Sequence, residues 1–354
     1  MTHSTYNLLF PEPLLSTSSA HIISLLLSTI YVGSIYFSQR ARLSLGSWNT
    51  KKDDDEDDVG KAMKGTRDDP DIVRARLLAV SLATIACMTV VFGVLWSRLR
   101  WDVHNVDLAW DATILRLGLP LCFIPASFDL SFTSLLSILP SFKLILPHLV
   151  VPILFSGPLF ACFLGGELPG QRHWRWNTTV VQRFFTIHGA RNYFIAPMTE
   201  EVVFRGCVLA VWHMADAGTR KMVWLAPLTF GLAHVHHVYE NFHRFGSDWN
   251  AAKRALFITL FQLGYTTVFG AMVSFIFLRT GSILPPITAH MFCNIMGFPD
   301  IGTELRRFPK WRRAIITAYV LGIAGFIYTL NRWTVVANNI YWPRKEDVFV
   351  IRRF

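Results

Sequence analysis

Three short motifs place polar side chains suited to hydrolysis inside otherwise apolar sequence. They run Glu-Glu-x-x-x-Arg, Phe-x-x-x-His and His-x-x-x-Asn along the chain, and their members are Glu200, Glu201, Arg205, Phe230, His234, His290 and Asn294. Ionisable side chains are costly at membrane depth, so a chain that keeps several of them there uses them for chemistry or transport.

Helical spacing gives the two carboxylates of motif one different surroundings. A helix advances about 100° per residue, so Glu201 and Arg205 share a face and can pair, whereas Glu200 points elsewhere. Pro197 predicts that the helix begins just upstream, which puts both carboxylates in its first turn, near the positive end of the helix dipole. We expect the Glu201–Arg205 pair to hold the helix in place or to bind a substrate carboxylate.

Motifs two and three each put their two members on one helix face by the same four-residue spacing. A carboxylate held against a histidine can take a proton from water, and histidine and amide donors can stabilise the oxyanion of a tetrahedral intermediate. We expect Glu200 and His234 to activate water. We expect His290 and Asn294 to form the oxyanion hole and Phe230 to pack at the site.

The residues alone leave two other classes of protein open. One is a metal-dependent membrane protease with Glu200, Glu201, His234 and His290 as ligands, because two histidines and a carboxylate can bind zinc. Adjacent glutamates face different directions, however, and no His-Glu-x-x-His motif occurs. The other class is a non-catalytic scaffold or transporter that keeps the polar pocket for ions or partners. We expect neither a metal nor another cofactor.

The elements that carry these motifs are predicted to be membrane helices. The chain is 52% hydrophobic and 16% charged, whereas soluble domains average about 25% charged residues. Leu77–Ser97 has no charge over about 21 residues, enough to cross roughly 30 Å of hydrocarbon. Similar apolar stretches lie at Ala20–Phe37, Leu144–Gly165, Met222–Ala233, Ala255–Leu278 and Ala314–Leu330. The sequence predicts an all-α, polytopic transmembrane bundle of about eight helices around an intramembrane polar catalytic cavity.

We divide the chain into three parts. Residues 1–110 form an N-terminal transmembrane region, 111–335 a core that carries the three motifs, and 336–354 a C-terminal tail. Residues 51–71 are rich in aspartate, which predicts a solvated loop on the cytosolic or lumenal side. The first apolar block has no basic start and no small-residue cleavage site, so it is expected to remain as an anchor.

Charge and cysteine usage exclude two further classes. The formal net charge is +10, but the basic residues stand singly or in pairs beside the apolar stretches, as in membrane flanks, so we expect no nucleic-acid partner. The five cysteines lie in apolar stretches without a Cys-x-x-Cys pair, which argues against a disulfide framework or a zinc knuckle. Histidines outside the motifs, His213 among them, are expected at the surface or the membrane interface.

The three motifs, in this order, resemble the signature of the eukaryotic type II CAAX prenyl endopeptidases, also called Ras-converting enzymes. These belong to the wider group of CAAX-protease and bacteriocin-processing proteins. The resemblance spans roughly Arg191–Asn294, and no motif position departs from the pattern. Connecting segments such as Arg191-Asn192-Tyr193 are similar as well.

The resemblance implies a multi-pass protein of the endoplasmic reticulum membrane with an active site reachable from the cytosol. It implies removal of the last three residues from farnesylated or geranylgeranylated CAAX proteins, such as small GTPases, by glutamate-activated water without metal or covalent intermediate. Carried over by position, Glu200 and His234 are the catalytic pair, and His290 with Asn294 stabilises the transition state. The implied partners are these prenylated proteins and the lipid bilayer.

Overall fold

The computed structural model describes residues 10, 13–37, 68–119, 142–224, 226–228, 237–336 and 339–342. Every regular element in these ranges is a helix, which confirms the predicted all-α class. Within them, the helices long and apolar enough to cross a membrane are α2 (Thr17–Phe37), α4 (Pro70–Arg98), α16 (Trp249–Thr280) and α19 (Arg312–Arg332). A bent pair adds a fifth if it is one span. The chain is a multi-pass helical membrane protein.

The remaining helical elements are shorter. In chain order they are η4 (Val103–Asn105), α5 (Val106–Arg116), α7 (Phe142–Leu154), α8 (Ser156–Gly165), η6 (Trp176–Val181), α9 (Gln182–Phe184), α10 (Ile187–Gly189), η7 (Ala190–Ile195), α11 (Ala196–Glu201), η8 (Val202–Cys207), α12 (Val208–Met214), α13 (Thr219–Trp224), α15 (His237–Arg244), α17 (Leu284–Met296), α18 (Ile301–Arg307) and η9 (Pro309–Trp311). Most of the acidic stretch 51–71 and part of the predicted span Met222–Ala233 lie outside the described residues.

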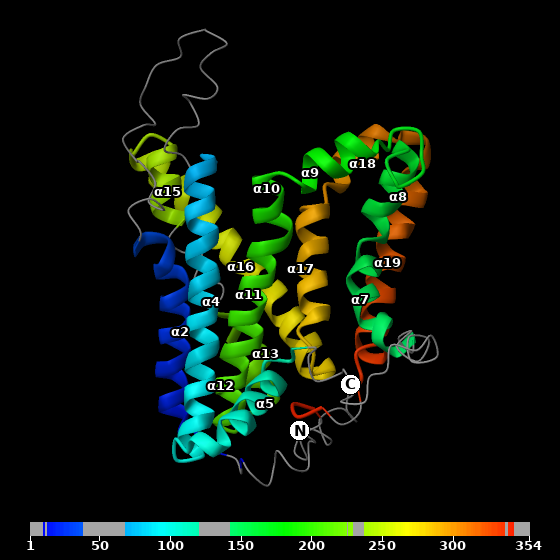
Figure 1. Ribbon diagram of the computed structural model, residues 1–354. Helices are drawn as coiled ribbons and strands as arrows, with labels where there is room; N and C mark the ends of the chain where they lie inside the picture. The colour runs from blue at the N-terminus through cyan, green and yellow to red at the C-terminus, as the bar shows by residue number, and fades with distance from the viewer. Residues whose placement is uncertain are drawn as a thin grey trace. The chain divides into compact units, whose positions relative to one another are not determined.

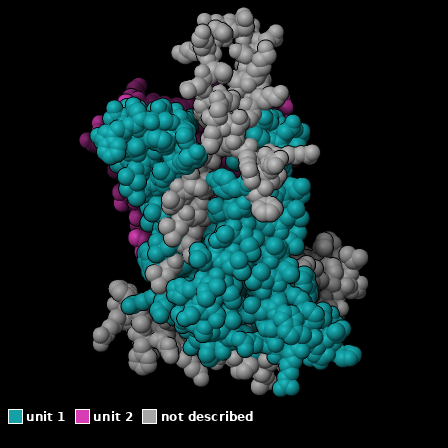
Figure 2. Space-filling view, turned by 90° about the vertical axis from the view of Figure 1, so that its left-hand side faces the viewer, with its two compact units in different colours: residues 1–117, 198–275 teal, residues 118–197, 276–354 magenta. Residues whose placement is uncertain are grey.

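The chain contains two compact units, each made from two stretches that are far apart in sequence (Figure 2). Unit 1 comprises residues 1–117 and 198–275, and unit 2 comprises residues 118–197 and 276–354. The sequence-based division at residues 110 and 335 stays a prediction. Motif one falls in unit 1 and motif three in unit 2.

In unit 1, α2 packs against α4 and α12 (Figure 1). Helix α4 packs in turn against α5 and η8. The start of α4 is specified locally. The Asp69 side chain caps the helix by accepting a hydrogen bond from the Asp71 N–H at 2.9 Å, and Pro70 supplies the fixed φ that suits a first helical residue. Ile22 and Leu25 of α2 are exposed, as expected for a span with one face toward lipid.

The opposite face of α2 is a buried stripe with helical spacing and mostly small side chains. Its members are Ala20, Ser24, Leu27, Ser28 and Tyr31. Small side chains let the backbones of neighbouring membrane helices approach closely, and close packing holds such helices together. The stripe therefore explains how a helix without charged residues acquires a fixed orientation in unit 1.

A buried polar pair in unit 1 corrects one prediction. Nη1 of Arg116, at the end of α5, lies 2.7 Å from Nδ1 of His213 in α12, and both side chains are buried. The prediction that His213 lies at the surface or interface was therefore wrong. Arg116 lies about 100 residues earlier in the chain, so sequence spacing gives no sign of the contact.

In unit 2, the predicted apolar span Leu144–Gly165 is broken into α7 and α8, whose axes meet at 73°. The break has two causes. Pro152 has no N–H to bond to the His148 carbonyl, and Phe155 leaves helical geometry with ψ at 19°. The Ser156 hydroxyl donates to the Ile153 carbonyl at 2.6 Å, which satisfies one acceptor exposed by the break. Helix α19 packs against both halves.

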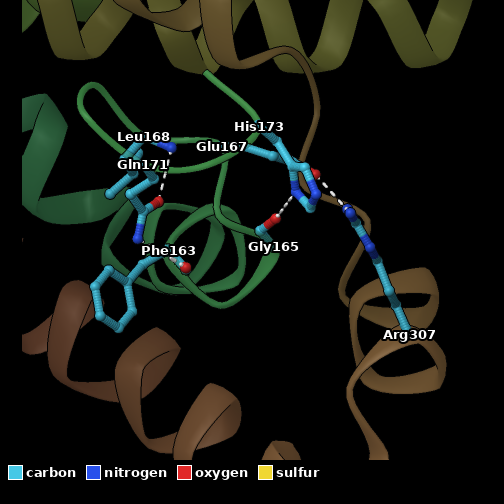
Figure 3. Close-up of polar contacts among 7 residues, drawn as sticks. All are labelled: Phe163, Gly165, Glu167, Leu168, Gln171, His173 and Arg307. Carbon is cyan, nitrogen blue, oxygen red and sulfur yellow. Dashed lines mark hydrogen bonds and ion pairs between the residues drawn. The ribbon is translucent and has the colours of Figure 1, made fainter. Parts of the chain in front are cut away.

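The connector that follows α8 is fixed by contacts to α18 and to its own backbone (Figure 3). Gly166 ends α8 in the left-handed conformation with φ at 69°, which glycine adopts without a steric penalty. Nδ1 of His173 donates to the Gly165 carbonyl at 2.6 Å, and Arg307 of α18 forms an ion pair with Glu167 at 2.6 Å. These contacts anchor the C-terminal end of α8 to α18.

Replacing Gly157 of α8 by alanine should destabilise unit 2. An added Cβ would lie 2.2 Å from the Tyr319 ring of α19. The ring cannot move aside freely, because its hydroxyl donates to Glu304 at 2.9 Å. We expect a loss of about 1–3 kcal/mol in unfolding free energy, the usual cost of overpacking. It should appear as a lower thermal unfolding midpoint in detergent.

Gly33→Ala is the matched control, since nothing lies within 4 Å of its added Cβ. Alanine in place of a helical glycine should leave the midpoint unchanged or raise it, with a gain of up to about 1 kcal/mol. Equal midpoints for Gly157→Ala and the unsubstituted protein would show that the space between Gly157 and the Tyr319 ring can accommodate a methyl group.

Candidate active site

Motif one lies in one uninterrupted helical run, from α10 through η7, α11 and η8 to α12. Pro197 is therefore inside a helix and does not begin one, so the prediction that the two carboxylates occupy a first turn was wrong. The six residues of α11 (Ala196–Glu201) have α-helical geometry, whereas η7 before them and η8 after them are π-helical. Short π-helical segments occur often at functional sites.

Pro197 supplies a physical reason for the first π-helical segment. Proline lacks the N–H that would bond to an earlier carbonyl, and its ring crowds the carbonyl four residues before it. Here the Ala196 N–H donates five residues back, to the Arg191 carbonyl, which is the π-helical pattern. The chain thereby accommodates the proline without ending the helix.

The predicted pairing of Glu201 with Arg205 is confirmed. Nε of Arg205 lies 3.2 Å from Oε2 of Glu201, and the two side chains are 1% and 0% exposed. The Arg205 guanidinium also lies over the Phe269 ring, 5.9 Å from its centroid. An added Cβ at Gly270 would lie 3.1 Å from Nη2 of Arg205, so this glycine leaves room for the arginine. A buried charge that is both paired and packed is the arrangement that avoids an uncompensated desolvation cost.

Glu200 lies one residue before this pair and is only half-buried. Its neighbour Thr199 is 9% exposed. Glu200 is therefore more accessible than both of its neighbours, which is possible because successive residues point about 100° apart. The more accessible carboxylate in motif one is that of Glu200, the residue predicted to meet water.

Motif three lies on α17, whose first turn contains Pro285 and Pro286. His290 is buried and Asn294 is exposed on the same helix. Nδ2 of Asn294 donates to the Asn192 carbonyl at 2.8 Å. A side-chain amide carries a second N–H, so this hydrogen bond orients Asn294 and leaves it one donor for a ligand.

In the same region of unit 2, hydrogen bonds from Arg183 also connect α17 with the segment that precedes motif one. Nη2 of Arg183 donates to the Ile295 carbonyl, and its Nε donates to the Tyr193 hydroxyl at 3.1 Å. The sequence does not single out Arg183 or Asn192 for this role. The only feature of the sequence that points to Asn192 is its place after Arg191, in a segment that resembles the endopeptidase family.

Motif two, Phe230 and His234, lies outside the described residues. Glu200, Glu201 and Arg205 are described within unit 1, and His290 and Asn294 within unit 2. Of the five cysteines, Cys87, Cys162, Cys207 and Cys293 are described, and no disulfide involves any of these four.

Comparison with known proteins identifies the segment that carries the motifs. Residues 182–296 match the family model described as type II CAAX prenyl endopeptidase Rce1-like. CAAX prenyl protease 2 of Homo sapiens is 37% identical over 199 residues, which cover 54% of this chain and 57% of that protein. CAAX prenyl protease 2 of Arabidopsis thaliana is 37% identical over 140 residues, which cover 40% of this chain and 42% of the relative.

CAAX prenyl protease 2 of Saccharomyces cerevisiae is 39% identical over 167 residues, which cover 42% of this chain and 52% of the yeast protein. The chain spans about half the length of the curated relatives it matches. No solved structure matches the chain. The segment 182–296, which carries all three motifs, is thus related to the type II CAAX prenyl endopeptidases.

Proposed function

We propose that the protein is an intramembrane endopeptidase that removes the C-terminal tripeptide from prenylated CAAX proteins. The observation that carries the proposal is the buried Glu201–Arg205 ion pair beside a half-buried Glu200, within the segment matched by the endopeptidase family. A membrane helix that neutralises one carboxylate and keeps its neighbour accessible has a built-in site for acid–base chemistry.

In the proposed reaction, Glu200 and His234 bind a water molecule between them. The Glu200 carboxylate takes one proton from this water as the water oxygen attacks the carbonyl carbon of the prenylated cysteine. The resulting tetrahedral intermediate collapses by breaking the C–N bond, and the proton held by Glu200 passes to the leaving amine. The products are a protein that ends in prenylcysteine and a free tripeptide.

His290 and Asn294 are proposed to donate hydrogen bonds to the oxyanion of this intermediate. Donors that are already oriented stabilise developing charge without reorganisation during the reaction. The hydrogen bond from Asn294 to the Asn192 carbonyl supports this role, because it fixes the amide before substrate binds. Glu201 and Arg205 are proposed to hold the helix in place, since both are almost fully buried.

A membrane enzyme suits a prenylated substrate. A prenyl chain partitions into lipid with about 0.8 kcal/mol per buried CH₂ group, which concentrates the substrate at the bilayer. We propose prenylated small GTPases as substrates and the endoplasmic reticulum membrane as the location. The CAAX prenyl protease relatives support a prenylated CAAX substrate, and the multi-pass helical architecture supports a membrane location.

The proposal is tested with the purified protein in lipid vesicles. It should release the tripeptide from a farnesylated CAAX peptide. Release from the unprenylated peptide of the same sequence should be at least ~100-fold slower, because the lipid chain contributes to the binding and orientation of the substrate. The measurement is chromatographic quantification of the tripeptide. Equal rates on the two peptides would argue against a prenyl-directed enzyme. Loss of activity with a tight zinc chelator would favour the metal-dependent alternative.

A further inference from the structure

The first span, α2, lies against the helical run of motif one and in the opposite direction. Near the start of α2, the Leu14 N–H donates to the Met214 carbonyl at the end of α12, at 2.7 Å. Further along, the rings of His21 and Trp212 make an edge contact with their centroids 4.5 Å apart. Later residues of α2 therefore meet earlier residues of the run, and the contacts lead toward motif one.

Near its C-terminal end, α2 contacts motif one itself through Tyr31. The hydroxyls of Tyr31 and Thr199 are 2.8 Å apart and share a buried hydrogen bond in which either can donate. The Tyr31 ring also meets the Phe204 ring edge-on, with centroids 5.8 Å apart. Tyr31 thus contacts the residue immediately before Glu200 and a residue one turn after it.

The position of this contact matters because α11 lies between two π-helical segments. A π-helical turn holds more residues than an α-helical turn and is less favourable, so the backbone alone does not firmly fix the rotation of Ala196–Glu201 about the helix axis. A rotation of about 100° moves each side chain into the direction of its neighbour. A hydrogen bond from a separate helix to Thr199 opposes such a rotation.

We propose that Tyr31 is a positioning residue for motif one: its hydroxyl, through Thr199, sets the rotation of α11 and thereby the direction of the Glu200 carboxylate. The proposal rests on the proposed endopeptidase function and extends the catalytic machinery to a helix that lies outside the matched segment 182–296. Tyr31 acts through Thr199 and is not assigned contact with substrate.

The first test is steady-state kinetics on the farnesylated peptide in vesicles. Tyr31→Phe keeps the ring contact with Phe204 and removes the hydroxyl, so kcat should fall about tenfold while KM changes by less than about twofold. Thr199→Val should have the same effect, and the double variant should be no worse than either single variant, because both remove one interaction. Thr199→Ser keeps the hydroxyl and should therefore have a near-normal kcat.

Ser34→Ala is the matched control on the same helix. It removes the hydrogen bond from the Ser34 hydroxyl to the Tyr31 carbonyl and leaves the Tyr31 phenol in place. Its kcat should equal that of the unsubstituted protein. The proposal is overturned if Tyr31→Phe keeps normal kcat, if the two substitutions have additive effects, or if Ser34→Ala lowers kcat equally.

A second test does not depend on catalysis. A thiol placed by Glu200→Cys should react with a maleimide at least about threefold faster when Tyr31→Phe is added, because α11 then samples other rotations. The Ser34→Ala background should leave the rate unchanged, and the chain with Glu200 intact supplies the background from native cysteines. An unchanged labelling rate overturns the proposal. A changed labelling rate also overturns it if Tyr31→Phe alone has an unchanged kcat. If the unsubstituted protein releases no tripeptide, the proposed function fails and this labelling experiment alone decides the role of Tyr31.

Discussion

Glu200→Gln is expected to reduce tripeptide release by about 10²–10⁴-fold, the range over which a general base contributes to catalysis. The amide has nearly the size of the carboxylate but cannot accept a proton from water. The substitution therefore opens no cavity, and the buried Arg205 keeps its ion pair with Glu201. The measurement is single-turnover release of the tripeptide from a farnesylated peptide, at saturating enzyme.

The matched control for this prediction is Glu167→Gln. It removes a carboxylate from an ion pair with Arg307 in which both side chains are substantially exposed, and such pairs contribute little to stability. Release by this variant should stay within about twofold of normal. If the folded Glu200→Gln variant releases tripeptide at the normal rate, the glutamate-activated mechanism is wrong. That result would favour the scaffold or transporter alternative.

Arg205→Met is expected to destabilise unit 1 by about 3–5 kcal/mol, because removing one partner of a buried ion pair leaves the other charge uncompensated. Methionine fills much of the volume of arginine, so the effect comes mainly from the stranded Glu201 carboxylate and the lost contact with Phe269. The measurement is the thermal unfolding midpoint in detergent, with peptide release measured below that midpoint.

The double variant Glu201→Gln with Arg205→Met separates charge from packing. It removes both charges, and replacing a whole buried pair is often nearly neutral, so it should recover most of the lost stability. Equal instability of the single and double variants would instead assign the loss to packing around Phe269. A single variant as stable as the unsubstituted protein would show that the ion pair contributes nothing measurable.

The long spans are predictable from sequence because hydrocarbon imposes a strong and simple constraint. Uncharged stretches near 20 residues long identify α2, α4, α16 and α19 to within a few residues at most ends. The same criterion misses the break between α7 and α8, because hydropathy is insensitive to backbone geometry. Pro152 is the sequence signal that would have revealed it.

The candidate site is only partly accessible to sequence reasoning. Pairing of Glu201 with Arg205 follows from helical spacing, and the structure confirms it even though a π-helical segment begins just after Glu201. The continuation of the helix through Pro197 is not predictable from local rules, which place proline at helix starts. The contact of Tyr31 with Thr199 joins residues 168 positions apart, and no periodicity reports such a contact.

The division of unit 1 into two distant stretches also affects how the protein can be dissected. The segment matched by the family model, residues 182–296, differs from the part that folds together, because residues 1–117 pack with 198–275. A fragment trimmed to the recognised region would lack α2 and α4 and would uncover Val203, Phe204 and Cys207, all of which are buried in the whole chain. The smallest autonomous fragment that holds Glu200 therefore has to retain the N-terminal third of the protein.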